Sequence, residues 1–166
     1  TSPMNLFQVA RLMAGFVGVF TLAQLPAFIS ALAETAHPSL SPSTGFGVSI
    51  AVGSVVTILL WLCGRRDRTQ IFRKETIAVA GLSYFLAGMM GAIPFFVSGL
   101  LSNPVDAYFE AMSGLTTCGA TVLGSGGNMD IEEVARSLLV WRAMLHVRAY
   151  CWFAATDASA TFDAAA

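Results

Sequence analysis

The sequence has few charged residues. Of its 166 residues, 9 are lysine or arginine and 10 are aspartate or glutamate, which makes 11% charged, whereas hydrophobic residues make up 55%. Average globular proteins have about a quarter of their residues charged. The composition is therefore that of a membrane protein and excludes an ordinary soluble domain. The formal net charge of -1 says little about partners, because the positions of the charges matter more in a membrane chain. No nucleic-acid partner is predicted.

Cysteine and known cofactor motifs are also scarce. The three cysteines, Cys63, Cys118 and Cys151, are odd in number, widely separated and free of C-x-x-C spacing. They indicate neither a disulfide framework nor a zinc site, so free thiols are expected. Phosphate-loop, dinucleotide and metal-binding motifs are absent, so we expect no cofactor and no ATP binding by this chain.

Charge is missing altogether from three long apolar runs, residues 12–33, 46–63 and 77–101. About 20 apolar residues in a helix span the roughly 30 Å hydrocarbon core of a bilayer. The sequence therefore predicts three transmembrane helices. A cleaved signal peptide is the alternative for the first run. However, the run is longer than the apolar region of a signal peptide, which usually has about 7 to 15 residues, and no clean cleavage site follows it. Pro26 and Pro94 are expected to kink or end their helices.

The basic residues predict the orientation. The densest cluster follows the second run and consists of Arg65, Arg66, Arg68, Arg73 and Lys74. Positive charge in short loops favours the cytoplasmic side, and Arg11 ahead of the first run agrees. A cytoplasmic N-terminus and a multi-pass topology follow.

The third run contains small residues four positions apart, at Ala87 and Gly91 and at Gly88 and Ala92. This spacing lets helices approach closely. The alternative is that glycine and alanine are simply common in membrane helices.

Residues 103–123 change from helical to extended character. Asn103 can cap a helix, Pro104 suits its first position, and Asp106 adds negative charge near the positive end of the helix dipole. The following run from 116 to 120 is β-branched and small, which favours extended backbone. A short helix followed by an extended strand is predicted.

This segment is too short and interrupted for an ordinary membrane span, because it contains Glu110 and two glycines. A re-entrant loop that enters from outside fits better, since irregular backbone at membrane depth must be buried in protein or line a watery cavity. Such a loop can present carbonyl oxygens to a dehydrated cation, beside the negative end of the short helix. The predicted ion-binding carbonyls are those of Thr116, Thr117, Cys118 and Gly119. Gly119 is expected at dihedrals that cost other residues about 1 to 2 kcal/mol.

The run D-A-Y-F-E-A-M-S-G-L-T-T-C-G-A-T-V-L, residues 106–123, resembles the first selectivity-filter loop of the Trk/Ktr/HKT superfamily of potassium transporters. The resemblance is specifically to the membrane subunit of the bacterial Trk potassium-uptake system. The flanking runs G-A-I-P-F-F-V-S and E-E-V-A-R-S-L-L-V-W-R-A-M-L-H are similar to that family's flanking helices, so the resemblance covers about residues 65–146.

The resemblance implies an all-α integral membrane protein with a fourfold pseudosymmetric pore built from helix, pore-loop, helix repeats. Residues 1–75 would be the two extra N-terminal helices and a basic loop, 76–146 the first repeat with an incomplete second helix, and 147–166 a tail outside the family. Potassium would be bound only by the filter, with Asp106 and Glu110 on the pore helix and at its mouth. The implied location is the bacterial inner membrane. The implied partners are lipid, the remaining repeats or identical subunits, and a cytoplasmic nucleotide-binding regulatory subunit.

Two features depart from the family pattern. Cys118 stands where a third threonine is usual, which backbone coordination tolerates. From 147 onward the sequence no longer resembles the family, and Arg148, Asp157 and Asp163 leave no apolar run long enough to complete the last helix. Truncation, a frameshift or a cloning tail would each explain this. One loop supplies one quarter of a filter, so we expect an N-terminal fragment or component that does not transport potassium alone.

Alternatives from other classes are weaker or less specific. A membrane enzyme would need Cys118 as nucleophile and His146 as base, but nothing aligns an oxyanion site. A non-transporting helical interaction module is the stronger rival. Glu110 is expected to pair within the bundle, because a carboxylate at membrane depth is costly unless satisfied, and Arg142 either snorkels or faces such a carboxylate.

Overall fold

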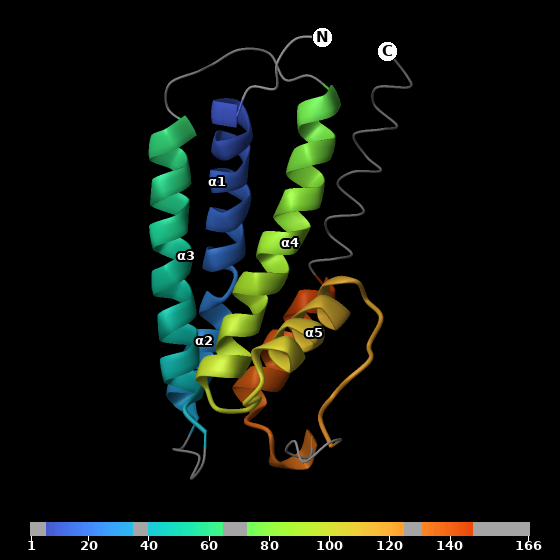
Figure 1. Cartoon of the computed structure of the whole chain (residues 1–166). Coiled ribbons are helices and arrows are strands. Elements are labelled where there is room, and N and C mark those ends of the chain that lie inside the picture. Colours follow the sequence, from blue (N-terminus) through green and yellow to red (C-terminus); the bar gives the residue numbers. More distant parts are fainter. Residues whose placement is uncertain (1–5, 35–39, 65–72, 125–130, 148–166) are drawn as a thin grey trace.

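The computed structural model describes residues 6–34, 40–64, 73–124 and 131–147. Within these ranges the chain is helical and contains no β-strand. Figure 1 shows α1, α3 and α4 running along a bundle, with the shorter α5 packed across one end of α4. Residues 65–72 of the predicted basic loop and residues 148–166 of the predicted tail lie outside the described residues, whereas Arg73 and Lys74, expected in the loop, form the start of α4.

The first apolar run forms two helices, α1 (Leu6–Leu22) and α2 (Leu25–Ala33), as Pro26 predicted. A proline nitrogen cannot donate a hydrogen bond to the preceding turn, so the helix breaks before it and restarts with Pro26 in the first turn. Gln24 occupies the break and is fully buried.

The second helix, α3 (Pro42–Gly64), begins earlier than the expected start at residue 46. Pro42 suits the first turn of a helix, so the turn-forming residues before the apolar run become part of it. The Ser41 amide donates to the Ser98 carbonyl at 3.0 Å, which ties the start of α3 to the end of α4 (Arg73–Val97).

Pro94 does not end α4. The helix continues to Val97 and stops where Gly99 takes a positive φ of 86°. This conformation is readily adopted by glycine and terminates a helix without the steric cost of a Cβ atom. The third predicted span therefore ends a few residues before the expected residue 101.

Two stretches of the described chain are long and apolar enough to cross a membrane, Val9–Ala33 and Pro42–Gly64. The described apolar part of α4, Gly81–Val97, is shorter. Many large apolar side chains of α3 are exposed on the bundle surface. They are Val48, Val52, Val55, Ile58, Leu59, Trp61 and Leu62.

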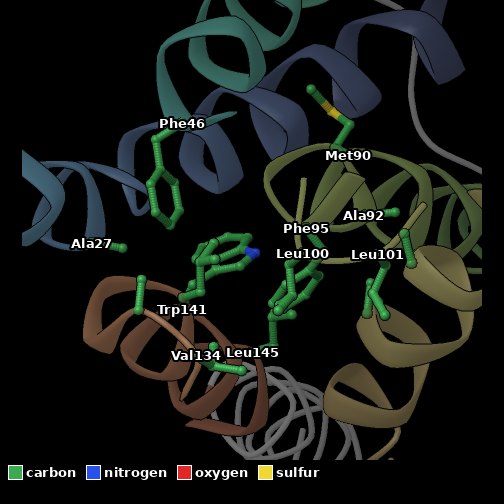
Figure 2. Packing of buried hydrophobic residues seen from close by; sticks show 14 of the residues in the cluster. Ala27, Phe46, Met90, Ala92, Phe95, Leu100, Leu101, Val134, Trp141 and Leu145 are labelled. Atoms are coloured by element: carbon green, nitrogen blue, oxygen red, sulfur yellow. The ribbon is translucent and has the colours of Figure 1, made fainter. Parts of the chain in front are cut away.

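Trp141 is the centre of the buried core and is fully buried. It lies in the C-terminal helix, residues 136–147, and its ring meets Phe20 and Phe46 edge-on at centroid distances of 5.8 and 6.1 Å. Its Nε1 donates to the Gly91 carbonyl at 3.1 Å. Figure 2 shows Trp141 between side chains of several helices, so this one residue joins the C-terminal helix to α1, α3 and α4.

The start of the C-terminal helix is capped from a distant part of the chain. Glu132 and Glu133 lie in a 3-10 turn, η1 (Ile131–Glu133), that precedes this helix. Glu34 at the end of α2 caps the helix. It accepts from the Arg136 amide at 2.6 Å and from the Ser137 amide and hydroxyl at 3.3 and 2.7 Å.

Candidate functional site

The site is built on α5 (Pro104–Leu115), whose start follows the predicted capping chemistry. The Asn103 side chain accepts from the Val105 amide at 3.0 Å, Pro104 opens the helix, and Asp106 lies in the first turn. Figure 1 shows α5 starting at the end of the bundle where α4 finishes, and the chain returning toward the same end at η1. The segment from α5 to η1 therefore begins and ends at the same end of the bundle.

Glycine on α4 allows α5 to approach closely. A Cβ atom at Gly88 would lie 2.5 Å from Met112 Sδ and 2.9 Å from Tyr108 Cε2, both on α5. One at Gly91 would meet the Ala111 Cβ at 3.3 Å. The small-residue spacing predicted as a close-approach face is therefore confirmed as the contact between these two helices.

A further α4 residue reaches the end of the short helix. The Tyr84 hydroxyl donates to the Leu115 carbonyl at 3.1 Å. The last carbonyls of a helix have no partner within it, so this hydrogen bond satisfies one of them. Tyr84 was not singled out from the sequence, because a tyrosine in an apolar run has no signal of its own.

The end of α5 turns sharply at Thr117. The Cys118 amide donates to the Ser113 carbonyl and the Thr117 amide to the Gly114 carbonyl, each at 3.1 Å. This pairing is the Schellman motif, whose turning residue is left-handed and usually glycine. Thr117 takes that place with a φ of 56°, an uncommon conformation for a β-branched residue.

Gly119 is also left-handed, with a φ of 74°, as predicted. The left-handed conformations of Thr117 and Gly119 prevent a continuous extended backbone. The predicted extended strand is therefore wrong, and the described segment after α5 is irregular. The sequence pattern of small and β-branched residues favoured extension, but the helix-ending turn and the glycine override that local preference.

The four predicted carbonyls differ in their partners. The Thr116 carbonyl accepts from the hydroxyl of Thr117 at 2.7 Å, and the Gly119 carbonyl accepts from Arg142 Nη2 at 3.3 Å. In the described part of the chain, no hydrogen bond reaches the carbonyls of Thr117 or Cys118. Cys118 and Gly119 are exposed, so the middle of the loop is open to the surroundings.

Glu110 is fully buried on α5 and its carboxylate is paired, as expected. Its Oε1 lies 2.7 Å from Arg142 Nε, close enough for an ion pair although the N–H is not aligned for a hydrogen bond. The carboxylate also accepts from the Thr121 hydroxyl at 3.1 and 3.2 Å and from the Val122 amide at 3.1 Å. Glu110 thus lies behind the loop and holds it.

Cys118 and His146, the pair considered for an enzyme, do not form a catalytic unit. His146 Nδ1 lies 2.9 Å from the Arg142 carbonyl one turn back in its own helix, and no hydrogen bond joins it to Cys118 among the described residues. In the same part of the chain, Cys63 and Cys118 are free and exposed. No group of three or more His, Cys, Asp or Glu side chains there could hold a metal ion.

These features define an all-helical chain with membrane-capable helices and a short helix whose following loop is folded back on it. No family model matches the sequence, and no solved structure matches it. The chain is 26% identical over 143 residues to the Trk system potassium uptake protein TrkH of Halomonas elongata. This match covers 86% of the chain and 28% of that relative.

Two further relatives agree. The Trk system potassium uptake protein TrkH of Salmonella typhimurium is 33% identical over 109 residues, which cover 65% of this chain and 20% of the relative. The Trk system potassium uptake protein TrkG of Escherichia coli is 25% identical over 141 residues, covering 84% and 27%. The expected resemblance is confirmed: this chain is similar to Trk system potassium uptake proteins and spans less than a third of the length of these relatives.

Proposed function

We propose that this chain is part of a Trk-type potassium transporter and that the loop after α5 lines the path of the ion. The observation that carries the proposal is that the carbonyls of Thr117 and Cys118 accept no hydrogen bond from any described residue, in a chain similar to potassium uptake proteins. A dehydrated cation needs such oxygens to replace its water shell. None of the three relatives named above is described as an enzyme, and we assign no enzymatic activity.

The electrostatics of the short helix support a cation at this place. The aligned peptide dipoles of α5 amount to about half a negative charge at its C-terminal end, which is where the loop begins. The Arg142 charge is balanced by the buried Glu110 carboxylate, so the pair leaves no net positive charge behind the loop. Carbonyl oxygens, and the helix end, then provide the negative potential.

The division of the chain belongs to the same proposal. Residues 1–75 would be two N-terminal helices with a cytoplasmic basic loop, 76–146 one helix, re-entrant loop and helix repeat, and 147–166 a tail outside it. The whole would lie in the bacterial inner membrane with its N-terminus in the cytoplasm. A cytoplasmic nucleotide-binding regulatory subunit and lipid would be its partners.

One loop supplies ligands from one side of the ion only, so we expect no transport by the 166-residue chain alone. The measurement is potassium-dependent growth of a host that lacks its own uptake systems. No rescue is expected from the chain alone, and growth at low potassium would contradict this prediction unless cross-linking in detergent detects a tetramer that brings four loops together.

The second candidate function is a non-transporting helical interaction module. The many exposed apolar side chains of α3 are compatible with it, because they could contact another protein as well as lipid. Ion flux in liposomes separates the two functions. A chain supplied with the remaining repeats conducts potassium if the loop lines the ion path, whereas a module shows no flux.

A further inference from the structure

We propose that Arg142 is a positioning residue for the ion path and that Glu110 holds its guanidinium in place. The assignment of the loop to an ion path rests on the function proposed above. The contacts between Arg142, Glu110 and the loop are independent of it. Arg142 lies on the C-terminal helix, which follows the loop in the sequence. Through its ion pair with Glu110 it connects this helix to α5.

The guanidinium contacts both the anchor and the loop. Its Nε lies 2.7 Å from Glu110 Oε1, and its Nη2 donates to the carbonyls of Gly119 and Ala120 at 3.3 and 3.5 Å. Arginine suits this task because its planar group offers several donors in fixed directions, whereas a lysine ammonium is a single point charge. The side chain is 17% exposed, so the pair is largely shielded from water.

The anchor is itself attached to the loop. Glu110 accepts from the Thr121 hydroxyl and the Val122 amide, and the Ser113 hydroxyl of the same helix donates to the Ala120 carbonyl at 2.6 Å. Four consecutive loop residues, 119–122, are therefore fixed by side chains of α5 and the C-terminal helix.

This fixed segment directly follows Thr117 and Cys118, whose carbonyls have no hydrogen-bond partner within the described part of the chain. The directions of the Thr117 and Cys118 carbonyls depend on the backbone on both sides of them. On the helix side the turn at Thr117 fixes that backbone, and on the other side the contacts from Arg142 and Glu110 do. Loosening Arg142 should then release Cys118 while leaving the rest of the bundle in place.

Cys118 provides a native reporter for the test. In the chain with Cys151→Ser, reconstituted in liposomes, the alkylation rates of Cys118 and Cys63 are measured by mass spectrometry of the modified peptides. R142K keeps the positive charge beside Glu110 but removes the planar guanidinium and its several hydrogen-bond donors. We expect Cys118 to react several-fold faster, with Cys63 unchanged, whereas the matched change R136K on the same helix leaves both rates unchanged.

Two results would overturn the positioning role. An unchanged alkylation rate of Cys118 in R142K would show that the guanidinium of Arg142 does not hold the loop. Equal acceleration of Cys118 and Cys63 would show that Arg142 serves only the stability of the whole bundle, because Cys63 lies on α3.

A second set of variants keeps the proposal testable if a single substitution prevents folding. E110Q or R142Q alone leaves one buried charge without its partner, which is the costly case, whereas the double variant E110Q/R142Q removes both charges. The proposal predicts that all three variants accelerate Cys118 and that the double effect is smaller than the sum of the single effects, since neighbouring groups that act together are not additive. Additive effects would contradict a coupled pair.

Measurements of ion flux separate this inference from the proposed function. In the liposome assay with the remaining repeats supplied, R142K should change the ratio of potassium to sodium flux, and R136K should not. An unchanged ratio alongside normal flux would overturn the role in the ion path. Absence of flux in the unmodified protein would instead refute the proposed function, while the Cys118 rates would still decide whether Arg142 holds the loop.

Discussion

Two left-handed residues, Thr117 and Gly119, shape the loop that follows α5. A left-handed conformation costs a residue with a Cβ atom about 1 to 2 kcal/mol, and it persists only where the surroundings hold it. At Thr117 the hydrogen bonds of the helix-ending turn provide this support. At Gly119 the absence of a side chain removes the cost.

Gly119→Ala is expected to lower the free energy of unfolding by about 1 to 2 kcal/mol. A Cβ atom there would meet nothing within 4 Å, so the cost is conformational and not steric. The matched control is Gly47→Ala in α3, where a Cβ atom also meets nothing within 4 Å but the backbone is helical. That change should stabilise the chain by up to about 1 kcal/mol. Denaturant unfolding in detergent measures both, and equal effects of the two changes would argue against the left-handed turn.

At the level of helices, the contact between α4 and α5 depends on small residues. Gly88 faces Tyr108 and Met112 on α5. Gly114 of α5 faces the C-terminal helix, where a Cβ atom added to the glycine would lie only 2.9 Å from the Leu145 Cβ. Apolar burial does not distinguish protein from lipid inside a membrane, so close packing contributes much of the association between helices. Small residues therefore decide where α5 docks.

Gly88→Val should weaken this docking by about 1 to 3 kcal/mol, because the added carbons collide with the Tyr108 ring and the Met112 side chain. Gly81→Val on the same helix is the control, since a Cβ atom there meets nothing within 4 Å. Thermal unfolding of both variants in detergent gives the comparison. If Gly81→Val destabilises as much as Gly88→Val, the close contact with α5 is not the cause.

Over the whole molecule, the arrangement of helix ends agrees with the proposed topology. Gly64 at the end of α3 packs against Arg11 near the start of α1, so the end of α3 and the start of α1 lie at the same end of the bundle. Figure 1 shows both at the same end, opposite the connection from α4 to α5. Arg11 is exposed at this end, and the proposed topology places it on the cytoplasmic side, where the charge rule favours positive residues.

Cys63 and the exposed residue Ser102 lie at opposite ends of this bundle and provide a test of orientation. With the remaining cysteines replaced by serine, a membrane-impermeant thiol reagent should label Cys63 in inverted vesicles and not in intact cells. Ser102→Cys should show the reverse pattern. Labelling of both positions from the same side would contradict the proposed topology, because a helix that spans the bilayer separates its two ends.

Much of the fold follows from local sequence. The break at Pro26, the cap at Asn103 and the left-handed Gly119 were predictable, because proline, asparagine and glycine act through their own covalent geometry. The left-handed Thr117 was not predictable in this way. Its left-handed conformation comes from the turn that ends α5. The local preference of a β-branched residue is instead for extended backbone.

The candidate site is divided in the same manner. The sequence of residues 106–123 determined a short helix, a following glycine-containing turn and the resemblance to potassium transporters. Contacts across the fold decided the rest: Glu34 caps a helix 102 residues away, Tyr84 satisfies the end of α5, and Arg142 reaches both Glu110 and the loop. Local sequence determines the conformation of a segment, whereas a polar side chain finds its partner only when packing brings distant segments within hydrogen-bond distance.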